Sequence, residues 1–250
     1  MNVEINGARI FFEIPILGGI PITDTIVNGT FVTLLILGLC IFLTRNLQER
    51  ATSKRQIVAE FLVETAHNFV VGNMGEKFAY YTPMVAALFS ASLFSSLLSL
   101  FGLYPPTSDL STTLGWAVLV FVLITYTKIH TGGIGGYLKG FAQPFFLFTP
   151  FNILSEVATP ISMAFRHFGN VMSGTVITAL VYAALAAASH ALFSWLPGAL
   201  GGILGSIPIL QVGIPAVLSV YFDLFSSFMQ AFIFCMLTTL YIANAVSEDS

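Results

Sequence analysis

The chain has 250 residues, of which 56% are hydrophobic and 8% are charged, and its formal net charge is −3. Average soluble domains contain roughly 25% charged residues, so this composition excludes an ordinary soluble fold, whose surface would carry too few charges to stay in water. The lack of a basic patch argues against nucleic-acid binding. We therefore expect an all-α, polytopic integral membrane protein in a lipid bilayer, with a single membrane domain over residues 1–250.

Long uncharged segments predict the membrane helices. No charged residue lies between Asp24 and Arg45, and a helix needs about 20 predominantly apolar residues to cross a bilayer. Similar uncharged segments recur along the rest of the chain. We expect about five membrane helices, namely three spans at residues 25–44, 79–103 and 111–130, and two longer helices containing polar residues at 144–188 and 206–246.

Turn residues predict the segments between these helices. Residues 1–24 are interpreted as an external, partly ordered N-terminal tail with several prolines and glycines. Pro105 and Pro106 end the second span, because proline cannot continue a helix. We expect a loop at the glycines of residues 132–136, and a second loop or a re-entrant turn at residues 197–208.

Basic residues predict the orientation. Arg45, Arg50, Lys54 and Arg55 follow the first span closely, and positive residues remain on the cytoplasmic side. The N-terminus is then outside, and an odd number of crossings places the C-terminus in the cytoplasm, as in a multi-pass protein of a bacterial inner membrane. Residues 51–76 mix apolar and charged positions, which favours an amphipathic helix at the membrane interface or a connector packed on protein.

Arg166 is the most informative residue of the sequence. The nearest formal charges are Glu156 before it and Asp223 after it. A charged arginine at mid-bilayer costs about 2.5–3.5 kcal/mol on insertion scales, and such residues by default line ion paths or polar cavities. The alternative is an arginine that extends to the membrane surface, which the long apolar flanks disfavour.

Other polar residues accompany Arg166 on its helix. Asn170 and Ser173 lie four and seven residues later and share its face, whereas Thr175 lies on the opposite face and His167 points sideways. Polar groups on two faces are typical of a wall between two aqueous paths. The alternative is that these hydroxyl and amide groups bond to the backbone or to neighbouring helices, and for Ser173 and Ser162 both interpretations stay open.

The last helix carries a second set of polar residues. Asp223, Ser227, Gln230 and Tyr241 are spaced to lie in one stripe along a helix. An acid in so long an uncharged segment marks an ion path or a counter-ion, or else a position at the water interface. Glu156 is interpreted as a cation-binding group at a channel mouth or as an interface residue. No metal-ligand spacing, phosphate-binding loop or catalytic triad is present, so we expect no cofactor and no catalytic centre.

Several segments resemble the subunit a family of rotary F-type ATP synthases. Residues 165–170, Phe-Arg-His-Phe-Gly-Asn, followed by Met-Ser-Gly at 172–174, are similar to that family's Arg-Leu-Phe-Gly-Asn-Met-x-Ala-Gly signature. Residues 230–234, Gln-Ala-Phe-Ile-Phe, resemble its closing helix, and residues 105–111 resemble its outer loop. The resemblance covers roughly residue 25 to the end, in the family's order. Thr175 and Asp223 depart from it, since the family commonly has glutamate or histidine there.

The resemblance implies a function and a set of partners. A non-catalytic stator subunit would conduct ions, protons first of all, through two offset half-channels beside a rotating ring of proteolipid subunits c, driving ATP synthesis or hydrolysis-coupled pumping. It would contact the peripheral-stalk subunit b and the remaining ATP synthase subunits, and its last two helices would form a tilted hairpin. The candidate ion-translocation residues are Arg166, Asn170, Gln230, Asp223, Glu156, Ser162, Ser173, Thr175, His167, Ser227 and Tyr241. The alternatives are a secondary transporter with Arg166 binding an anionic substrate, and a structural membrane scaffold.

Overall fold

The computed structural model describes residues 7–15, 19–49, 53–143, 145–193, 217–218 and 220–247. Within these residues the chain is predominantly helical, which confirms the predicted all-α membrane class. Five helical segments are long and apolar enough to cross a bilayer: Asp24–Thr44, Glu76–Phe101, Leu110–Gly140, Phe146–Leu192 and Asp223–Ala245. The prediction of about five membrane helices is confirmed.

The expected N-terminal tail contains a small β-hairpin. Strands β1 (Ile10–Ile14) and β2 (Ile20–Thr23) pair antiparallel. The hairpin joins the first helix, α1 (Asp24–Thr44), where the Asp24 backbone N–H donates to the Arg9 carbonyl at 3.0 Å. Short-range pairing of two β-rich segments of this kind is possible without a large core.

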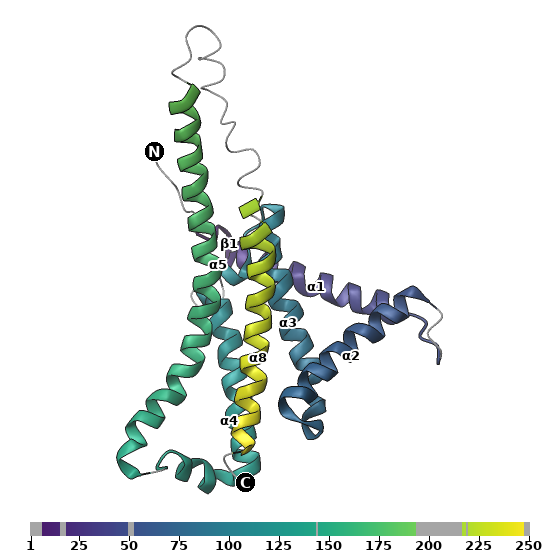
Figure 1. Ribbon diagram of the computed structural model, residues 1–250, viewed down its shortest axis with the longest axis vertical. Coiled ribbons are helices and arrows are strands. Elements are labelled where there is room, and N and C mark those ends of the chain that lie inside the picture. Colours follow the sequence, from purple (N-terminus) through teal and green to yellow (C-terminus); the bar gives the residue numbers. More distant parts are fainter. Residues whose placement is uncertain are drawn as a thin grey trace.

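Helix α2 (Lys54–Met74) leaves the end of α1 at an angle (Figure 1). Its first turn is capped by the Ser53 hydroxyl, which accepts a hydrogen bond from the Gln56 N–H at 3.3 Å. The apolar side chains of residues 61–63 are all exposed although three successive residues point to different sides of a helix. The first half of α2 is thus apolar around most of its circumference, and its polar residues Gln56, Glu60 and Glu64 recur every four residues on one side. Its position at the membrane interface stays a prediction.

The second span is built from α3 (Thr82–Leu97) and two flanking 3₁₀ segments, Glu76–Tyr81 and Leu98–Phe101. The loop after it folds back onto α1 and α3. Thr25 donates to the Asp109 carboxylate at 3.0 Å, Asn28 donates to the Tyr104 carbonyl at 2.8 Å, and the Ser96 and Thr107 hydroxyls are 3.0 Å apart. Burial, with the nearby Asp109 and Asp24 carboxylates, raises the pKa of the Tyr104 phenol.

Helix α4 (Leu110–Gly140) corrects the prediction of a glycine-rich loop. The helix was expected to end near residue 130, but it continues through the glycines of residues 132–136 as two helical pieces joined at a kink. Gly133 forms the kink with φ of 70°, a conformation that glycine adopts without a steric penalty. A single residue therefore absorbs the change of direction, and the rest of the segment remains helical.

Helix α5 (Thr149–Phe193) is the longest element, with 45 residues. At 1.5 Å per residue it extends over about 67 Å, roughly twice the ~30 Å hydrocarbon core of a bilayer. In Figure 1, α5 and α8 (Ser226–Ser247) follow the long axis of the molecule, whereas α1 points away to one side. The tilt of these two helices in the membrane stays a prediction. The predicted loop at 197–208 lies outside the described residues.

The core lies where α3, α4, α5 and α8 pack together. Three alanines at these contacts, Ala117, Ala164 and Ala231, are completely buried. Small residues let helix backbones approach closely, which is how membrane helices gain packing energy without a strong hydrophobic drive between them. This contact fixes the rotation of α5, and therefore decides which of its side chains face away from the bundle.

Candidate functional site

Arg166 lies on the side of α5 that faces away from the bundle. Met163, Ala164 and His167 are at most 3% exposed, while Arg166 and its neighbour Phe165 are exposed. No described residue forms a hydrogen bond or an ion pair with the Arg166 guanidinium. Arg166 is also 17 residues from the start of α5, about 25 Å along the helix, too far for its side chain to reach that end. Within the described part of the chain, Arg166 is thus an unpaired cation on a surface that otherwise carries only apolar and uncharged polar side chains.

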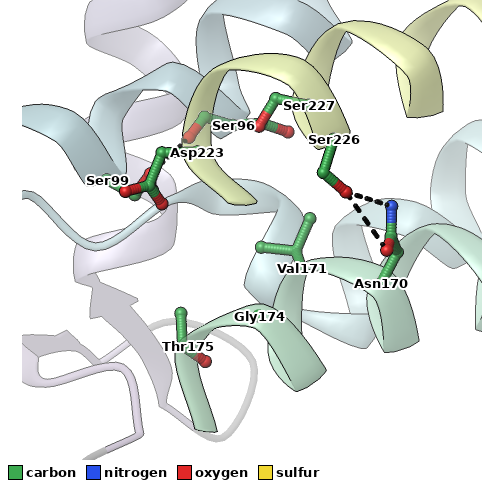
Figure 2. A pocket seen from close by; sticks show the side chains of 9 residues that line it. All are labelled: Ser96, Ser99, Asn170, Val171, Gly174, Thr175, Asp223, Ser226 and Ser227. Carbon is green, nitrogen blue, oxygen red and sulfur yellow. Dashed lines mark hydrogen bonds between the residues drawn. The ribbon is translucent and has the colours of Figure 1, made fainter. Parts of the chain in front are cut away.

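Asn170 joins α5 to α8 one turn after Arg166. Its amide donates to the Ser226 hydroxyl at 3.0 Å and to the Gln230 amide oxygen at 3.4 Å, and Ser226 donates back to the Asn170 oxygen at 3.3 Å. Figure 2 shows the two dashed contacts between Asn170 and Ser226. Gln230 itself is only 4% exposed. The structure therefore brings together Asn170 and Gln230, which the sequence analysis had placed on two separate helices.

A small polar cavity lies beside this contact. Its volume is about 20 Å³, enough for about one water molecule. The Asp223 carboxylate accepts a hydrogen bond from the Ser99 hydroxyl at 3.0 Å, and Figure 2 shows both groups on the far side of the cavity from Asn170. Thr175, expected on a different face of α5 from Asn170, lines the same cavity. The described lining residues are Ser96, Ser99, Asn170, Val171, Gly174, Thr175, Asp223, Ser226 and Ser227.

Asp223 belongs to a π-helical segment, Val220–Phe225. Such wider turns are rare in proteins and are frequent at functional sites. The sequence analysis found Asp223 and Ser227 but missed Ser96, Ser99 and Ser226. Hydroxyls at residues 92, 96 and 99 follow a helical spacing of four and three, so a polar stripe on the second span was the signal available. Serine hydroxyls are common between membrane helices, where they form structural hydrogen bonds, so this stripe did not by itself indicate a cavity.

A second, larger cavity lies between α4 and the first part of α5. Its volume is about 710 Å³. Lys128 and Glu156 form an ion pair in its wall, with Nζ–Oε distances of 2.9 and 3.2 Å. The remaining described lining residues are mostly polar or glycine: Gly136, Tyr137, Gly140, Phe141, Gln143, Asn152, Ser155, Thr159 and Ala245. Sequence analysis had identified Glu156 but not its partner, because the two residues are far apart in the chain.

Besides Arg166 and Gln230, four predicted residues lie outside both cavities, as far as their described lining extends. His167 is completely buried, with Nε2 3.3 Å from the Ser92 hydroxyl and its ring edge-on to Trp116 and Phe234. Tyr241 packs against the apolar core. The other two, Ser162 and Ser173, are on the exposed surface of α5, and Ser173 donates to the Asn170 carbonyl at 3.1 Å.

Arg166 separates the two cavities along α5. Thr159, in the wall of the larger cavity, precedes it by seven residues, and Asn170, in the wall of the smaller one, follows it by four. These offsets correspond to about 10 Å and about 6 Å along the helix. The cavities also contact opposite ends of α8, near residues 223–227 and at Ala245. The fold and the site together define a polytopic α-helical membrane protein with polar cavities on both sides of an intramembrane arginine.

Comparisons with known proteins identify the family. The family described as ATP synthase A chain matches residues 26–243. The ATP synthase subunit a of Moorella thermoacetica is 32% identical over 94% of this chain and 95% of its own length. The subunit a of Desulforamulus reducens is 32% identical over 83% of this chain and 73% of its own length. The sodium-ion-specific subunit a of Propionigenium modestum is 30% identical over 92% of this chain and 76% of its own length. The chain belongs to the ATP synthase subunit a family, which confirms the resemblance. It is therefore a membrane subunit of the ion-translocating part of ATP synthase, with roles in ion transport and ATP synthesis.

Proposed function

We propose that this subunit conducts protons through two offset half-channels against a rotating c-ring. The observation that carries the proposal is the position of Arg166 between two polar cavities that contact opposite ends of α8. A continuous channel would let ions leak across the membrane without turning the ring. Two cavities with a fixed cation between them require each ion to travel on the ring from one to the other.

The distribution of basic residues assigns the cavities to the two sides. The larger cavity contains Lys128 and contacts the ends of α4 and α8. After α1, which Arg45 and Lys54 follow, the two crossings α3 and α4 would return the chain to the side of these basic residues. By the positive-inside rule this side is cytoplasmic, with the C-terminus inside and the N-terminus outside. The smaller cavity with Asp223 is then the outer half-channel, and the larger one is the inner half-channel.

Arg166 supplies the electrostatic switch between the two paths. Guanidinium stays protonated throughout the accessible pH range, so it cannot carry the proton itself. It attracts a deprotonated carboxylate on a passing ring subunit and releases it when a proton arrives from the outer cavity. Asp223, with Ser99, Thr175 and Ser227 around it, receives the proton first. The driving force is about 2.3 kcal/mol per charge for each 100 mV of membrane potential.

The geometry disfavours the transporter alternative. A transporter that bound an anion through Arg166 would hold the guanidinium inside a binding cavity. Arg166 is not among the described residues that line either cavity; its side chain faces outward from α5. An outward-facing arginine instead suits contact with a separate partner, here the ring of subunits c. The peripheral-stalk subunit b and the other synthase subunits complete the proposed assembly, and no residue of this chain performs bond chemistry.

Site-specific crosslinking tests the proposed ring contact. A photoreactive amino acid at Phe165, which is 54% exposed beside Arg166, should crosslink to the small ring proteolipid in membranes that contain the whole complex. The same group at Leu37 on α1, also 54% exposed, should give no ring product, because α1 is on another side of the bundle (Figure 1). Ring products from Leu37 but none from Phe165 would overturn the proposal.

A further inference from the structure

The larger cavity contains one pair of opposite charges, and no other formal charge occurs among the described residues of its wall. The Lys128 ammonium contacts both oxygens of the Glu156 carboxylate, at 2.9 and 3.2 Å. The side chains are 21% and 18% exposed, so the pair borders the cavity and is less screened by salt than a fully exposed pair. The electrostatic fields of two opposite charges this close largely cancel for an ion farther away in the cavity. The described wall is therefore polar but has no net charge.

Net neutrality matters for an ion that must leave quickly. An uncompensated carboxylate in the wall would hold a departing cation by Coulomb attraction, and an uncompensated ammonium would repel it. The uncharged polar groups around the pair can hydrate an ion without holding it.

We propose that Lys128 keeps Glu156 as a fixed counter-charge, so that the cavity passes cations without binding them. Glu156 is then a charge-balancing residue and does not relay protons, and Lys128 is a functional residue of the cavity that the sequence analysis did not identify. The inference rests on the proposed function of the larger cavity as the inner half-channel. Glu156 is ten residues before Arg166, about 15 Å along α5, so the ion pair acts on the entrance of the path and not on the arginine itself.

Three variants separate charge balance from the other roles of the pair. The whole ATP synthase is reconstituted in vesicles with its soluble part outside, so that the cytoplasmic side of this subunit faces the medium. When ATP is added, the complex pumps protons from the medium into the vesicle. In this direction protons enter through the larger cavity. Glu156→Gln leaves an uncompensated ammonium that repels them and should slow uptake about fivefold at low salt, whereas Lys128→Gln leaves a carboxylate that attracts them and should not slow uptake. The double variant Lys128→Gln, Glu156→Gln removes both charges and should recover most of the uptake that Glu156→Gln loses. High salt should reduce the differences among the variants.

Two outcomes would overturn the inference. If the double variant were as slow as Glu156→Gln, and Lys128→Gln were fast, Glu156 would be a proton relay. If all three variants were equally slow, and only the exchanged pair Lys128→Glu, Glu156→Lys recovered uptake, the ion pair would merely tie α4 to α5. In both cases the order of rates would not follow the net charge of the cavity.

A separate variant distinguishes failure of this inference from failure of the proposed function. Arg166→Ala in the same preparation should block coupled proton uptake in every background. If Arg166→Ala pumps normally, the half-channel function itself is wrong. If Arg166→Ala is blocked while the rates of the Lys128 and Glu156 variants do not follow cavity charge, only the charge-balance inference fails.

Discussion

We expect Arg166→Ala to abolish proton-driven ATP synthesis while the variant still folds and assembles. The side chain is exposed and has no hydrogen bond or ion pair with any described residue, so its removal breaks no contact within the described part of this chain. What is lost is the only fixed charge between the two cavities along α5. On the proposed mechanism, a ring carboxylate would then pass this position without being attracted in its charged form, and protons would no longer have to travel around the ring. ATP synthesis in vesicles with an imposed proton gradient measures the effect.

Arg166→Lys tests whether this position needs a permanently charged guanidinium or whether any positively charged side chain is sufficient. Lysine is a compact ammonium that loses its proton readily when desolvated, unlike guanidinium, and it cannot form bidentate contacts with a carboxylate. We therefore expect Arg166→Lys to lose most of the synthesis rate as well. The control is Leu37→Ala on α1, at an exposed apolar position outside both cavities, which should assemble and synthesise ATP normally. Robust proton-driven synthesis by Arg166→Ala would contradict the account.

We expect Asp223→Asn to slow proton entry through the proposed outer half-channel. Asp223 is the only carboxylate among the described residues of the smaller cavity, and asparagine keeps its shape but cannot take up and release a proton. Loss of a positioned proton-transfer group commonly costs about 10²-fold or more in rate; we expect a decrease of roughly tenfold or more in proton flux. Flux through the membrane sector, measured with a pH-sensitive dye at several outer pH values, tests this.

Two further variants of the same cavity give matched controls. Ser99→Ala removes the hydroxyl that donates to Asp223 at 3.0 Å but keeps the carboxylate, so its effect on flux should be clearly smaller. Asp223→Glu keeps a titratable group and should recover part of the flux. Unchanged proton entry in Asp223→Asn would mean that the outer path does not pass through this carboxylate.

The membrane class and the helix positions could be predicted because they depend on local composition. Predominantly apolar segments of sufficient length located the five helices of the described residues that are long enough to span a bilayer, and the cost of an intramembrane charge singled out Arg166 without any knowledge of its surroundings. The family signature around residues 165–170 added the function. These features belong to single segments and need no information about packing.

The features that the sequence did not predict depend on contacts between distant segments. Ser99 and Asp223 are 124 residues apart and meet only because α3 packs against the start of α8. Lys128 and Glu156 likewise pair across two helices. The glycines at 132–136 were misinterpreted as a loop because composition does not show that one positive φ angle, at Gly133, is sufficient for the change of direction.

Labelling of single cysteines from each side of the membrane tests the central claim most directly. In a variant with Cys40 and Cys235 replaced, Thr175→Cys places a thiol in the smaller cavity and Thr159→Cys places one in the larger cavity. Silver ion is small enough for a cavity of about 20 Å³ and protects a thiol from later alkylation. The account predicts that Thr175→Cys is protected only by silver added outside and Thr159→Cys only by silver added inside. Protection of both cysteines from the same side would contradict two half-channels separated by Arg166.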